Sequence, residues 1–223
     1  MNYQISQLYD SIFHVRCETQ EDLAYLFLRS QEYYESRNID FYRQNFKIDA
    51  FKEWYCRSFT GEDTFTYPYD WCGFNVPGAI ALSATNGAFK IGDNNKYDEA
   101  MLEVIQRCQK DSKRFYLIGT MDEVSDLQTL SSALAHELAH AFYYVDADYR
   151  NTMNQLTAPI LQRMQVVLYL NGYHPSVIQD EAQAYLVDGI ELLGLEEDYS
   201  GIQRLVKIVF EKHINFNLRT QLF

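Results

Sequence analysis

One segment has an apolar side and a side of small residues when it is drawn as a helix, which limits where it can lie in a fold. It spans residues 125–146, SDLQTLSSALAHELAHAFYYVD. Its apolar residues recur at helical spacing, and Ser125 with Gln128 forms a capping-box pattern, so we predict a helix. The apolar stripe holds Leu127, Leu130, Leu134, Leu138, Ala141 and Val145. The opposite side holds two histidines among the small residues Thr129, Ser132, Ala133 and Ala147. We therefore expect a buried helix with space beside its histidines.

These two histidines belong to a five-residue motif, His136-Glu137-Leu138-Ala139-His140. Residues four apart lie one turn apart on one helix face, so both imidazoles can bind one Zn²⁺ at about 2.0–2.1 Å. Glu137 leaves the helix about 100° from His136, where it can take a proton from a water that the metal activates. The motif predicts a zinc site in which His136 and His140 are ligands and Glu137 is the general base.

The H-E-x-x-H motif resembles the active-site helix of the zincin metallopeptidases. In that superfamily an edge strand of a small mixed sheet precedes this helix and pairs with extended substrate. The apolar run at residues 114–120, RFYLIGT, occupies the corresponding place in this chain. The resemblance implies a zincin-like fold, a Zn²⁺ cofactor, and hydrolysis of peptide bonds in a peptide or protein substrate.

Two carboxylates compete for the place of the third metal ligand. Asp146 lies six residues after His140, as in metzincins, but those proteins carry a glycine where this chain has Tyr143. Glu181 lies on a separate predicted helix among small residues, which is similar to the gluzincin arrangement. The gluzincin resemblance therefore implies Glu181 as the third ligand, and Asp146 is interpreted as a helix-end carboxylate.

One position departs from the gluzincin pattern. The best-known gluzincins carry an aspartate four residues after the third ligand, where it supports a zinc histidine, whereas this chain has Tyr185 there and its next acid on that face is Asp188. Peptide hydrolysis also requires a donor for the developing oxyanion. Tyr143 and Tyr173 are candidates, but we predict His174 and Tyr185 as the catalytic residues beside Glu137.

The rest of the chain favours an α+β protein with a mainly helical C-terminal half. Residues 61–92 hold seven of the glycines and prolines, which predicts short strands and tight turns. Helices are predicted at 19–36, 47–59, 96–111, 152–172, 175–194 and 199–217. We expect a single domain over residues 1–223, with a mixed N-terminal part at 1–95 and a catalytic helical part at 96–223.

Composition excludes several partners. The net charge of −12 disfavours nucleic acid, because phosphate backbones would be repelled. The N-terminal residues carry no signal-peptide pattern, no apolar run is long enough to span a membrane, and the four cysteines show no paired spacing. These features predict a cytoplasmic protein, and they leave its oligomeric state open.

The sequence thus predicts a zinc metallopeptidase of gluzincin type. Two alternatives remain open at this point. One is a non-catalytic zincin-fold binding or regulatory module with a structural metal, although such a module has no need of Glu137. The other is a metallohydrolase that acts on a non-peptide amide.

Overall fold

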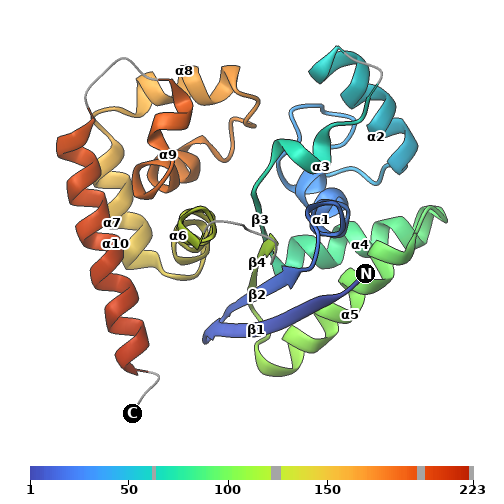
Figure 1. Ribbon diagram of the computed structural model, residues 1–223, viewed down its shortest axis with the longest axis horizontal. Coiled ribbons are helices and arrows are strands. Elements are labelled where there is room, and N and C mark those ends of the chain that lie inside the picture. The colour runs from blue at the N-terminus through green and yellow to red at the C-terminus, as the bar shows by residue number, and fades with distance from the viewer. Residues whose placement is uncertain (62–63, 122–126, 195–198, 221–223) are drawn as a thin grey trace. The chain divides into compact units, whose positions relative to one another are not determined.

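The computed structural model describes residues 1–61, 64–121, 127–194 and 199–220, and these fall into two compact units, Met1–Leu127 and Gln128–Phe223 (Figure 1). The division follows residue 127, not residue 95 where the expected N-terminal part ends. The expectation that 1–223 acts as one domain stays a prediction. Ser125 of the predicted capping box lies outside the described residues.

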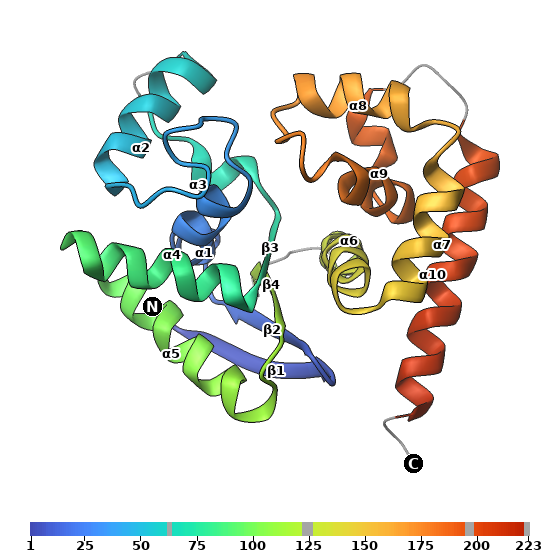
Figure 2. The ribbon, with the colours of Figure 1, turned by 180° about the vertical axis from the view of Figure 1, so that it is seen from behind.

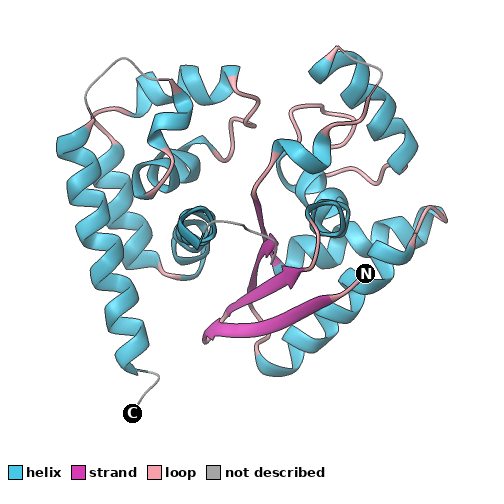
Figure 3. Ribbon diagram, viewed as in Figure 1, coloured by secondary structure: helices cyan, strands magenta, loops and turns pink. Residues whose placement is uncertain are grey.

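The first unit contains a four-stranded mixed sheet with the strand order β1-β2-β4-β3 (Figure 3). Strands β1 (Tyr3–Tyr9) and β2 (Ile12–Cys17) form an antiparallel hairpin. Strand β2 pairs in parallel with β4 (Tyr116–Met121), which pairs antiparallel with β3 (Gly73–Pro77). The expected α+β class is therefore confirmed.

Helices α1 (Gln20–Glu35), α4 (Gly78–Ile91) and α5 (Lys96–Asp111) supply the core on one face of this sheet (Figure 2). Thr19 caps α1 by accepting a hydrogen bond from the backbone N–H of Asp22. Gly119 on β4 lets α1 approach closely, because a Cβ there would lie 2.5 Å from the ring of Phe27. Shorter helical segments complete the unit: α2 (Ile48–Trp54), η1 (Tyr55–Thr60) and α3 (Tyr67–Asp70).

The regular elements of the second unit are all helices in the part of the chain that the structure describes. Its elements are α6 (Leu127–Val145), α7 (Ala147–Thr157), α8 (Leu161–Leu170), α9 (Ile178–Val187), η2 (Ile190–Leu193) and α10 (Ser200–Thr220). Helix α9 packs against α7, α8 and α10. It is therefore an interior helix of its unit, and its first turn is well buried.

Several sequence expectations are wrong in detail. The strand expected at 114–120 is β4, but β4 lies between β2 and β3 and is not an edge strand. Among the residues of 61–92 that the structure describes, β3 is the one strand and α4 is the largest element. The helix expected at 152–172 is two helices, because Pro159 has no N–H to continue the α7 ladder. The helix expected at 175–194 ends at Val187.

None of the helices that the structure describes is both long and apolar enough to cross a membrane.

The first unit is also held by a buried ion pair. Arg29 of α1 donates from Nε to Oδ1 of Asp98 on α5 at 2.8 Å, and both side chains are nearly inaccessible to solvent. The guanidinium also donates to the backbone carbonyl of Asp93 at 2.9 Å and to that of Phe46. Removing the Arg29 guanidinium would leave the Asp98 carboxylate buried without its charged partner.

We predict that Arg29→Met destabilises the first unit by about 3–5 kcal/mol, the usual cost of breaking a buried pair. Urea denaturation measures the free energy of unfolding. The matched control is Arg57→Met, since Arg57 pairs with Glu53 at 2.8 Å on the open surface and should cost less than about 1 kcal/mol. Equal losses in the two variants would contradict the prediction.

Candidate metal centre

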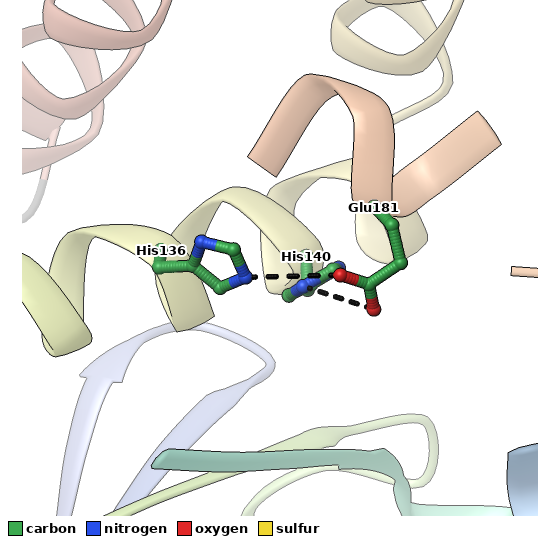
Figure 4. Close-up of side chains that lie close together, drawn as sticks. All are labelled: His136, His140 and Glu181. Atoms are coloured by element: carbon green, nitrogen blue, oxygen red, sulfur yellow. Dashed lines mark ion pairs between the residues drawn. The ribbon is translucent and has the colours of Figure 1, made fainter. Parts of the chain in front are cut away.

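Helices α6 and α9 bring three side chains of the predicted zinc site together (Figure 4). His136 and His140 extend from α6, and the Glu181 carboxylate extends from α9 toward both imidazoles. Oε2 of Glu181 lies 3.8 Å from Nε2 of His136, and Oε1 lies 3.6 Å from Nε2 of His140. One ligand atom from each residue lies within 4.8 Å of the other two. The three residues predicted as ligands therefore converge.

The local sequence explains this convergence. The i, i+4 spacing places His136 and His140 on one face of α6, with ring centroids 5.0 Å apart. Glu181 lies in the first turn of α9, where the helix dipole stabilises negative charge. Ala182 and Ala184 beside it are fully buried, so α9 can approach its neighbours closely.

Each histidine makes a second contact through its other ring nitrogen. Nδ1 of His136 donates to the backbone carbonyl of Asp188 at 3.0 Å. Nδ1 of His140 contacts Oδ1 of Asp180 at 2.9 Å. In the neutral rings, both contacts would keep the proton on Nδ1 and leave the Nε2 lone pair facing Glu181, which is the tautomer that a metal at Nε2 requires.

Sequence reasoning missed the role of Asp180. It directly precedes Glu181, so α9 places two consecutive carboxylates against opposite nitrogens of the His140 ring. The adjacency of two acids was the available signal. The Asp188 side chain, considered from sequence as a partner, instead accepts a hydrogen bond from Ser132 on α6, while its backbone carbonyl serves His136.

The electrostatics of the site reflect its crowding with acids. Burial alone would lower the pKa of His140, but Asp180, Glu181 and Glu137 together raise that pKa well above its ordinary value. Burial likewise opposes protonation of His136, yet Glu181 and Glu137 raise its pKa. Burial raises the pKa of Asp180. The raised pKa values mean that the buried carboxylates favour a positive charge, from a proton or a cation, at the two imidazoles.

One buried atom tests whether a metal fits this donor set. Oε2 of Glu181 has no hydrogen-bond partner, although Glu181 is only 3% exposed. A buried carboxylate oxygen without a donor is costly. A divalent cation between this oxygen and the two Nε2 atoms would satisfy it, and two imidazoles with a carboxylate suit zinc. The residues present therefore fit a zinc ion.

The remaining candidate catalytic residues differ in what they contact. The ring of Tyr185 packs edge-on against His136, with centroids 4.9 Å apart, and its hydroxyl shares a 2.6 Å hydrogen bond with Tyr173. His174 contacts Ser176 Oγ at 2.8 Å within the turn before α9. Tyr143 donates its hydroxyl to Asn154 at 2.7 Å. Catalytic roles for Tyr185 and His174 stay predictions.

Asp146 is the N-cap of α7 and not a member of the cluster. Its Oδ1 accepts from the backbone N–H groups of Asp148 and Tyr149, at 2.8 and 3.0 Å. Its Oδ2 lies 3.4 Å from Nε2 of His213. The interpretation of Asp146 as a helix-end carboxylate is confirmed.

Comparisons with known proteins add no assignment: no family model, no curated protein and no solved structure matches this chain. The functional argument therefore rests on the site alone.

We predict that Glu181→Ala loses most zinc affinity, because two imidazoles alone leave a zinc ion under-coordinated. Asp146→Ala is the matched control, since it removes a carboxylate from the same unit but outside the cluster. Competition of each variant with a chelator measures the zinc dissociation constant, and circular dichroism checks that both variants are folded. Zinc loss in Asp146→Ala with retention in Glu181→Ala would refute this ligand set.

Proposed function

We propose that this protein is a zinc-dependent metallopeptidase of gluzincin type that hydrolyses a peptide or protein substrate. The observation that carries the proposal is the convergence of His136, His140 and Glu181 beside Glu137. Within the described part of the chain, these three residues form the one group with metal-binding geometry. A three-residue site leaves a coordination position for water and substrate, which is typical of catalytic zinc.

Glu137 performs the proton transfers in this proposal. Its side chain is buried, at 6% exposure, and close enough to raise the pKa of both histidines. It would take a proton from the attacking water and pass it to the amine that leaves. When bound by His136, His140 and Glu181, zinc would supply a more acidic water and polarise the scissile carbonyl.

The oxyanion donor is best sought at the pair formed by Tyr173 and Tyr185. The Tyr185 ring lies against His136, and the two phenols are joined by a hydrogen bond, so either O–H could be redirected toward a substrate oxygen. Nδ1 of His174 contacts Oγ of Ser176, which makes His174 a weaker candidate for the oxyanion donor.

A closed, purely structural metal site would need a fourth protein ligand. Asp146 and His174 are two side chains of this unit whose chemistry would suit that place. Asp146 caps α7 and His174 bonds within its own turn. These contacts support an open site and hence the enzyme over a binding module.

We predict that Glu137→Gln retains zinc but lowers peptide hydrolysis by at least 10²–10⁴-fold, because the base is lost while the ligands remain. Mass spectrometry of a peptide library incubated with zinc-loaded protein measures cleavage. Glu191→Gln, an exposed glutamate of the same unit, should cleave like the wild type. Equal cleavage by wild type and Glu137→Gln would refute the proposed base.

A further inference from the structure

A hydrogen-bonded series of buried polar side chains extends from His140 on the side away from the metal position. Gln183 donates from Nε2 to Oδ1 of Asp180 at 3.0 Å. Tyr149 donates from its hydroxyl to Oε1 of Gln183 at 3.1 Å. Gln183 is fully buried and Tyr149 is 3% exposed, so both polar groups are shielded from bulk water.

The direction of these hydrogen bonds is fixed by chemistry. A phenol O–H that points to Oε1 turns the amide N–H₂ of Gln183 toward Asp180, and the opposite amide orientation would set Oε1 against a carboxylate oxygen. Every donor in the chain therefore points toward Asp180. The carboxylate receives one N–H from Gln183 and one from Nδ1 of His140.

This arrangement has a consequence at the metal position. When the His140 ring is neutral, as a metal ligand must be, holding Nδ1 as a donor puts the lone pair on Nε2, the nitrogen that faces Glu181 at 3.6 Å. Residues that orient a ligating histidine in this way typically change metal affinity by 10–100-fold when they are mutated.

The last side chain of this hydrogen-bonded series, Tyr149, is also held in place. The Tyr149 ring packs against Phe142 of α6 at 5.9 Å and against His213 of α10 at 5.0 Å. Tyr149 lies on α7, and Gln183 lies on α9. The chain thus connects the metal ligand on α6 to two further helices of the same unit.

We propose that Gln183 and Tyr149 are positioning residues for the metal centre, which hold Asp180 against Nδ1 of His140 and so set the affinity for zinc. The inference rests on the proposed zinc site. It assigns no contact with substrate to either residue.

The test compares variants that delete a polar group and keep its packing. Tyr149→Phe removes only the hydroxyl, and Gln183→Met keeps an unbranched side chain of similar length. Thr157→Val is the matched control, because it deletes a fully buried hydroxyl of α7 that bonds to the Met153 carbonyl and to Gln179, not to Asp180, Gln183 or Tyr149. Chelator competition measures the zinc dissociation constant, and thermal unfolding of the metal-free proteins measures stability.

We expect Gln183→Met to weaken zinc binding about tenfold. Tyr149→Phe should weaken it by a smaller factor, and Thr157→Val should leave it unchanged although it also loses a buried hydrogen bond. In an Asp180→Asn background, Gln183→Met should have no further effect on zinc, because its action passes through Asp180.

Two failures are distinguishable. If the wild-type chain binds no zinc, the metal centre is refuted and the positioning role with it. If the wild type binds zinc, and Gln183→Met and Tyr149→Phe bind it as tightly as Thr157→Val, only the positioning role is refuted. Additive effects of Gln183→Met and Asp180→Asn would also overturn it.

Discussion

Burial of opposite charges between α6 and α9 is the constraint on which the second unit depends. Asp180 and Glu181 approach opposite nitrogens of His140, at 2.9 and 3.6 Å, and both carboxylates lie in a helix's first turn. Buried carboxylates are costly unless they are paired or bind a cation. The carboxylates raise the pKa of both histidines, which favours protons there, and a divalent cation would offset the negative charge more fully. The same contacts therefore define both the packing and the chemistry of the site.

The sequence predicted the convergence of three side chains better than it predicted the fold around them. His136, His140 and Glu181 could be singled out because the roles proposed for them require fixed spacing on one helix and an acid on another. Asp180 could not be inferred from spacing alone, since its role depends on how α9 is rotated against α6. The hydrogen bonds of Gln183 and Tyr149 depend on three helices meeting, which no local pattern encodes.

The fold was harder to read for local reasons. Residues 61–92 resemble strands and turns by their glycines and prolines, but Pro77 occupies the N-cap position of α4, and Gly92 ends this helix in the left-handed conformation. The hairpin of β1 and β2 lacks an Asn-Gly or Asp-Gly turn and was not predicted. The apolar run of β4 indicated a strand correctly. Its nearly complete burial reflects an interior place in the sheet, not an edge.

Zinc bound by His136, His140 and Glu181 is the central claim, and X-ray absorption at the zinc edge of the zinc-loaded protein tests it most directly. The expected spectrum shows two imidazole nitrogens and carboxylate or water oxygens at about 2.0–2.2 Å. In His140→Ala, the imidazole signal should fall by half. A sulfur shell at about 2.3 Å, which would indicate zinc on the cysteines, or a spectrum without imidazole would contradict the claim.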